Sequence, residues 1–205
     1  MDSGRPSNGE RFTVFARLMH WIMAVMTLAM IFIGVTMVTS VSHRDLLLAI
    51  HRPLGTAILV FVVVRFGYRL FHRPPPHPPT MHPLDHLAAT ASEYLFYALL
   101  FAQPLVGWAL LSAAGTPIVL FEAVRLPAIA PHSTMLYSVL RDAHTVLAYL
   151  LFLVFVAHLC GVLFHSMILR DGVLDRMAFW RPARPRQEPV PDAARAVAPL
   201  ERRGR

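Results

Sequence analysis

Five of the eleven histidines in this chain lie inside apolar stretches, where ionisable side chains are rare. They are His20, His51, His144, His158 and His165. Ionisable groups are costly in a bilayer, and those found there usually face the interior of a helix bundle and serve a function. For any single one of them, a hydrogen bond between helices is the alternative to a binding role.

The spacing of four of these histidines places them at two depths. His144 and His158 are 14 residues apart, which corresponds to about 21 Å of helical rise and nearly four turns, so both project from one face. His20 lies near the start of the first apolar stretch and His51 near the start of the second. Because successive helices cross in opposite directions, depth pairs His20 with His158 and His51 with His144.

Two pairs of imidazoles at two depths suit two haem b groups, each held by a histidine on either face. Haem b needs only axial ligands and an apolar slot, whereas zinc needs three or four ligands that converge at one depth. With both axial positions filled, the iron has no open site for oxygen or peroxide, so we expect electron transfer. A haem-free transporter or scaffold, whose histidines bind protons or metal, is a further possibility.

Two arginines are candidates to pair with haem propionates, because guanidinium matches carboxylate geometry. Arg65 follows His51 by 14 residues, so it lies on the same face and about 21 Å deeper, near the His20 pair. Arg17 lies one turn from His20. For both arginines the alternative is snorkelling toward the lipid head groups.

The composition predicts a membrane protein. Hydrophobic residues make up 56% of the chain and charged residues 15%, whereas a soluble domain carries about 25% charged residues. Apolar stretches at about 14–39, 46–70, 92–113 and 140–169 are each long enough to span a bilayer. We therefore expect an all-α transmembrane four-helix bundle surrounded by membrane lipid.

The sequence predicts three regions along the chain. Residues 1–11 form a polar N-terminal segment, residues 12–180 the transmembrane domain, and residues 181–205 a disordered tail rich in Pro, Ala and Arg. Between the third and fourth stretches, an amphipathic piece from Ile118 to Ile129 is expected to lie along the membrane surface.

The basic residues predict the orientation. All 19 are arginine, and 15 of them fall in the N-terminal segment, around the second connection and in the C-terminal segment. Arginine is enriched on the cytoplasmic side of membrane proteins, so both termini are expected there. The formal charge of +7 does not indicate nucleic-acid binding, because no folded basic face with interleaved stacking aromatics is present.

The motifs of the four stretches resemble those of the bacterial cytochrome b561 family. The shared residues are Arg17, His20 and Trp21 in the first stretch, His51, Gly55, Val64, Arg65 and Arg69 in the second, Pro104, Gly107, Gly115 and Pro117 in and after the third, and His144, His158, His165, Arg170, Asp171, Leu174, Asp175, Arg176 and Met177 in and after the fourth. The resemblance covers residues 12–180. It implies a multi-pass protein of the bacterial inner membrane with two haem b groups bound by the four paired histidines.

The resemblance also implies electron transfer between a membrane quinone and a second redox partner. In the best defined activity of the family, superoxide gives its electron at the outer haem and ubiquinone is reduced near the inner one. His165 matches a histidine close to the quinone end, although simple packing is the alternative. A superoxide:ubiquinone oxidoreductase is therefore the expected enzyme, with no individual catalytic residue identified.

The identity of the electron donor stays open at this point. The outer connections, of about six and 28 residues, offer little area for a large partner and favour superoxide or another small donor. The alternative is a cytochrome b subunit that anchors a hydrogenase or dehydrogenase, a redox protein partner, and passes its electrons to quinone.

Overall fold

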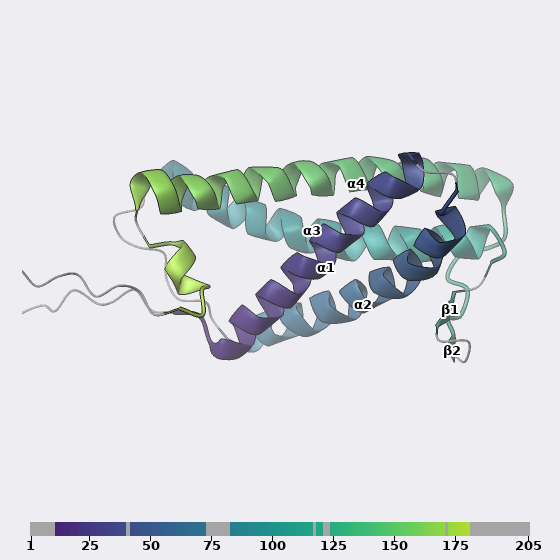
Figure 1. Cartoon of the computed structure of the whole chain (residues 1–205). Helices are drawn as coiled ribbons and strands as arrows, with labels where there is room; N and C mark the ends of the chain where they lie inside the picture. Colours follow the sequence, from purple (N-terminus) through teal and green to yellow (C-terminus); the bar gives the residue numbers. More distant parts are fainter. Residues whose placement is uncertain are drawn as a thin grey trace, which may run out of the picture.

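Four long antiparallel helices form most of the protein (Figure 1). The structure, a computed structural model, describes residues 11–39, 42–72, 83–116, 118–120, 124–170 and 172–180. The helices are α1 (Val14–Thr39), α2 (Arg44–Phe71), α3 (Pro83–Ala113) and α4 (Thr134–Leu163). All four are long and apolar enough to cross a membrane. The predicted all-α transmembrane bundle is therefore confirmed. The segments 1–10 and 181–205, which include the expected tail, lie outside the described residues.

Two helices begin earlier than the apolar stretches of the sequence. α3 begins at Pro83 rather than near residue 92, and proline is favoured in a first helical turn because its missing N–H would be unpaired there anyway. α4 begins at Thr134 rather than near residue 140, because the Ser133 hydroxyl caps it by accepting a hydrogen bond from a first-turn N–H. Hydropathy locates the membrane span but not the polar turns that extend it.

The helices pack mainly against their neighbours in sequence. α1 packs on α2, α2 on α3, and α3 on α4. Within the described ranges, α4 has no comparable packing against α1 or α2, and Figure 1 shows α1 and α2 running at an angle to α4. The fourth helix is therefore held by α3 and leaves its opposite face to other contacts.

The buried core lies midway along the bundle. Its residues are Met23 from α1, Ile58 and Val62 from α2, Tyr97, Leu99 and Leu100 from α3, and Leu151 from α4. On α4, Leu147, Leu151 and Val154 belong to or pack against this cluster and recur every three or four residues, the period of a single helical face. His144 and His158 continue this pattern at its two ends.

The outward surface of the helices is apolar. Large side chains such as Phe32, Val38, Leu153 and Met167 are between 63 and 84% exposed. A soluble monomer rarely exposes an apolar surface of this extent, whereas lipid tails solvate it.

The two ends of the bundle are built differently. One end carries two short antiparallel strands, β1 (Val119–Leu120) and β2 (Val124–Arg125), and we call it the hairpin end. The strands occupy the region of the expected amphipathic piece. At the terminal end, residues 172–180 lie beside the start of α1 (Figure 1). This segment contains a short 3₁₀ turn, Leu174–Arg176.

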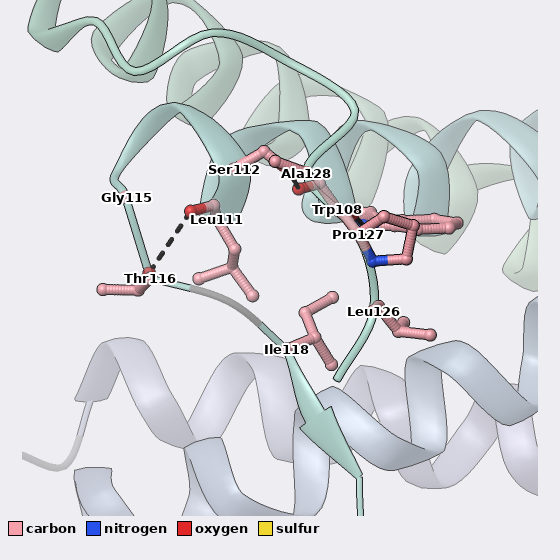
Figure 2. Close-up of a pocket in the computed structure, with 9 residues that line it drawn as sticks. All are labelled: Trp108, Leu111, Ser112, Gly115, Thr116, Ile118, Leu126, Pro127 and Ala128. Atoms are coloured by element: carbon pink, nitrogen blue, oxygen red, sulfur yellow. Dashed lines mark hydrogen bonds between the residues drawn. The ribbon is translucent and has the colours of Figure 1, made fainter. Parts of the chain in front are cut away.

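A small pocket lies between the end of α3 and the hairpin (Figure 2). Its volume is about 120 Å³. The lining consists of Trp108, Leu111, Ser112, Gly115, Thr116, Ile118, Leu126, Pro127 and Ala128. Two polar groups of this lining already have hydrogen-bond partners. The Trp108 indole donates to the Pro127 carbonyl, and the Thr116 hydroxyl donates to the Leu111 carbonyl. No histidine lines the pocket, so it is separate from the histidine pairs.

The arginine distribution predicts that the hairpin end faces outward. In a Cys160→Ser background, Ala128→Cys in the exposed hairpin connection should react with a membrane-impermeant maleimide on intact spheroplasts. His72→Cys, at the opposite end, should react only after the membrane is opened. The reverse labelling pattern would mean that the termini face outward.

Candidate haem-binding site

The clearest cluster of chemically active side chains joins α2 to α4 near the hairpin end. The rings of His51 and His144 lie with their centroids 6.1 Å apart and their planes at 67°. In each ring Nδ1 is buried and has no hydrogen-bond partner. A buried polar atom without a partner costs about 1–3 kcal/mol, so this pair is suited to a ligand that both rings can bind.

The separation of these two rings suits one metal ion between them. A metal–imidazole bond is about 2 Å long and the nitrogen lies about 1 Å from the ring centroid, so two rings on one ion have centroids about 6 Å apart. The helices that carry the rings do not pack extensively on each other. The two histidines would therefore suit a metal-bearing macrocycle held between them.

Two residues of α3, one turn apart, shape the position of His144. Gly107 leaves room for the ring, because a Cβ at this position would lie 3.1 Å from His144 Cε1. The Gln103 amide nitrogen donates a hydrogen bond to the backbone carbonyl of His144 at 3.1 Å. The same nitrogen lies 3.3 Å from Nε2 of the His144 ring. The wall that α3 forms therefore fixes both the backbone and the ring of this histidine.

The second pair lies toward the terminal end, between α1 and α4. His20 has Arg65 and His158 as its electrostatic neighbours. The His158 ring stands edge-on to Phe96 of α3, with centroids 5.3 Å apart and planes at 87°. Within each depth-matched pair expected from the spacing, the two histidines thus lie close together. Each pair joins α4 to a helix against which α4 packs little.

The two candidate propionate arginines have different surroundings. Arg65 donates to the Tyr97 hydroxyl at 3.3 Å and to the Ala16 carbonyl at 3.4 Å, and both of these partners are uncharged. Arg17 donates to the Ala178 carbonyl at 2.8 Å, while its Nε is buried and unpaired. Each guanidinium thus retains capacity to bind a carboxylate.

Arg69, one turn after Arg65, is already neutralised. It forms a forked ion pair with Glu93 of α3, with N–O distances of 2.5 and 2.7 Å. Such bidentate pairs are the strong form of the interaction. Of the two α2 arginines at this end, Arg65 is therefore the one available to a second anion.

His165 lies where α4 changes its hydrogen-bonding pattern. Residues Phe164–Leu169 form a π-helix, a local insertion that is frequent at functional sites. The neighbouring Ser166 hydroxyl is buried and has no hydrogen-bond partner. The segment then ends at Arg170, whose backbone is left-handed with φ of 52°.

Three polar residues of this region were not singled out from the sequence. Gln103 could have been found, because a polar side chain within an apolar stretch is itself a signal. Ser166 carries no comparable signal, since serine is a common small residue in membrane helices. Glu93 pairs with Arg69 across 24 residues, and no periodicity links two positions on different helices.

The described residues contain no group of three or more His, Cys, Asp or Glu side chains that could hold a bare metal ion. Each level instead offers two imidazoles. This donor set fits haem, whose porphyrin supplies the other four ligands.

The room left by Gly107 predicts a selective effect of a side chain there. Gly107→Val should displace the His144 ring and remove the haem of the hairpin-side pair, so that the pyridine haemochrome ratio falls from about two to about one per chain. Gly67→Val is the matched control, because nothing lies within 4 Å of an added Cβ there and its position 16 residues after His51 places it on another face of α2. Two fully retained haems in Gly107→Val would contradict a macrocycle held at this level.

Comparison with known proteins agrees with this geometry. A family profile described as prokaryotic cytochrome b561 matches residues 11–180. A protein of Escherichia coli (strain K12) named cytochrome b561 homolog 2 is 30% identical over 172 residues, which cover 82% of this chain and 91% of that protein. A protein of Yersinia pestis named probable superoxide oxidase CybB is 29% identical over 136 residues, 66% of this chain and 77% of its own length.

Family membership accounts for the apolar helices and the paired histidines together. Proteins of this family bind haem b, and four membrane-spanning helices make this one a multi-pass protein of the bacterial inner membrane. The chain therefore belongs to the prokaryotic cytochrome b561 family and takes part in electron transfer at the membrane.

Proposed function

We propose that this chain carries electrons from a small donor outside the membrane, superoxide, through two haem b groups to ubiquinone near the cytoplasmic side. The observation that carries the proposal is the facing pair His51 and His144, whose rings are 6.1 Å apart and whose Nδ1 atoms lack partners. Among the described residues, neither Nδ1 atom has a hydrogen-bond partner that would offset the cost of burying it.

The four histidines would serve as axial ligands, His51 with His144 and His20 with His158. When bound, haem b supplies reversible one-electron transfer. The 14 residues between His144 and His158 separate the two levels by about 21 Å along α4. With two histidines holding the group at each level, the metal would have no open position for oxygen or peroxide.

Arginines at the terminal-side level would hold the propionates. Arg65 suits this role because its present partners, the Tyr97 hydroxyl and the Ala16 carbonyl, are uncharged. Arg17 has an unpaired Nε but shares its guanidinium with the Ala178 carbonyl. Arg65 is therefore the principal candidate and Arg17 the auxiliary one.

Two observations support superoxide as the donor: the name of a relative and the positive charge at the hairpin end. The Yersinia pestis relative carries the name of a probable superoxide oxidase. At the hairpin end, Arg44 and Arg141 are exposed, and Arg52, next to His51, has a buried Nε without a partner. These cations would attract a small anion.

The overall reaction balances with two turnovers of the donor. Two superoxide ions each give up one electron and leave as O₂, and one quinone takes up two electrons and two protons to become quinol. His165 would hydrogen-bond a quinone carbonyl, in the π-helical segment where the Ser166 hydroxyl is buried without a partner. Protons would come from the cytoplasmic side, which avoids their passage through the apolar core.

Substitution of the ligands should separate the two haems. His20→Ala and His158→Ala should lose the same haem, while His51→Ala and His144→Ala should lose the other, because an imidazole near one face of the bilayer cannot reach a metal near the opposite face. Each variant should contain about one haem instead of two, and low-temperature EPR should identify which remains. Loss of the same spectral component in His20→Ala and His51→Ala would contradict the pairing.

The direction of transfer can be tested by mixing the oxidised protein with a pulse of superoxide in a stopped-flow instrument. Wild-type haem should become reduced, and His51→Ala should abolish this reduction. His165→Leu should keep haem reduction but slow quinone reduction about 100-fold, the lower end of what a proton-transferring group contributes.

Two results would revise the proposal. Wild-type haem that stays oxidised after the pulse would eliminate superoxide as the donor and favour the cytochrome that anchors a hydrogenase or dehydrogenase. Unchanged quinone turnover in His165→Leu would remove the role of that residue alone.

A further inference from the structure

Residues 172–180 form a compact segment that crosses from the end of α4 to the start of α1. We call it the strap; Figure 1 shows it at the terminal end, between these two helices. Two left-handed residues, Arg170 with φ of 52° and Gly172 with φ of 74°, allow the chain to reverse after the π-helix. The left-handed region is readily available to glycine and unusual for arginine.

The strap is folded upon itself. Its 3₁₀ turn, Leu174–Arg176, is followed by Ala178, which is fully buried. The Trp180 indole donates a hydrogen bond to the Asp175 carboxylate at 2.8 Å. The segment therefore presents a defined set of carbonyl groups to its surroundings.

Arg11 binds three of these carbonyls. Its Nε donates to Asp175 at 3.2 Å, and its Nη2 donates to Ala178 at 2.5 Å and to Trp180 at 2.7 Å. A guanidinium carries five donors in a planar fork, so one side chain can hold several carbonyls that have no partner in a regular helix. Arg11 thus fastens the strap along most of its length.

The first turns of α1 add further bonds of the same kind. The Arg17 guanidinium donates to the Ala178 carbonyl at 2.8 Å, and the Trp21 indole donates to the Met177 carbonyl at 3.0 Å. The backbone N–H of Phe12 donates to the Arg176 carbonyl at 3.3 Å. The strap is therefore bonded to α1 at Arg17 and Trp21, about one turn apart, and to Phe12 just before the helix.

These bonds matter because α1 and α4 are held by different neighbours. Within the described residues, α1 packs on α2 and α4 packs on α3, and the two helices do not pack extensively on each other. His20 on α1 and His158 on α4 nevertheless belong to one level. Apart from the chain of helices α1–α2–α3–α4, the strap is the direct connection between them at this end.

We propose that the strap sets the spacing between α1 and α4 and thereby positions His20 opposite His158. This inference rests on the proposed role of these two histidines as ligands of one haem. Metal sites tolerate deviations of only about 0.2 Å in ligand distance, so a small outward movement of α1 would detach one imidazole. His20 lies one residue from Trp21, within the part of α1 that the strap holds.

The test compares Arg11→Gln with Arg125→Gln in the full-length protein. Arg11→Gln removes the fork and should lose the His20–His158 haem, so that the haem content falls from two to one per chain and one low-spin EPR signal disappears. The His51–His144 signal should remain. Arg125 is exposed in β2 at the opposite end, and its substitution makes the same change in charge, so Arg125→Gln should retain both haems.

A disulfide tether distinguishes positioning from direct binding. The backbones of Phe12 and Arg176 are already hydrogen-bonded, so Phe12→Cys with Arg176→Cys, in a Cys160→Ser background, can link α1 to the strap. Oxidation of this pair in the Arg11→Gln variant should restore the second haem and its EPR signal, and reduction should remove them again. Failure of the oxidised tether to restore the haem would mean that Arg11 acts directly on the cofactor, which overturns the proposal.

The same series separates this inference from the ligand assignment. If His20→Ala loses one haem while Arg11→Gln keeps both with unchanged spectra, the strap proposal alone is wrong. If His20→Ala itself keeps both haems, the ligand assignment is wrong and the strap proposal falls with it. If Arg11→Gln loses both haems, restoration of the His20–His158 signal by the oxidised tether supports the proposal, and its absence overturns it.

Discussion

The structure depends on how an imidazole is accommodated inside a membrane-spanning bundle. A buried donor or acceptor that loses its partner costs about 1–3 kcal/mol, and in lipid no water is present to replace that partner. The Nδ1 atoms of His51 and His144 are both in this position. Coordination of a metal by these rings would supply a strong bond that offsets such a cost in helices that are otherwise apolar.

This constraint also explains the unusual packing of the helices. A four-helix bundle usually fills its centre with interdigitating side chains. Here the tightly buried residues, such as Val62 and Leu151, form one cluster midway along the bundle, and the histidine pairs lie beyond it in both directions. α4 packs mainly against α3, and its histidine-bearing face meets α1 and α2 through side chains only at this central cluster. The family binds haem b, and a macrocycle at each level would complete these contacts.

The sequence predicted the spans and the histidine pairs because both follow from periods within single helices. Fourteen residues return to the same face of α4 wherever that helix packs. The helix starts at Pro83 and Thr134 precede the apolar stretches, since capping and first-turn chemistry extend a helix beyond its apolar part. Gln103, the Arg69–Glu93 ion pair and the strap were missed because they join distant segments through hydrogen bonds whose partners share no periodic relation.

The two arginines of α2 illustrate what the structure adds to a motif. Arg65 and Arg69 are one turn apart and of the same type, so the sequence cannot assign them different roles. The structure distinguishes them by hydrogen bonding: Arg69 forms an ion pair with Glu93, whereas Arg65 influences Glu93 through its charge and bonds to uncharged groups next to His20. A cation favours the more negative, reduced state of a nearby redox group. For the proposed function, Arg65 would therefore raise the reduction potential of the His20–His158 haem and draw electrons toward the quinone side.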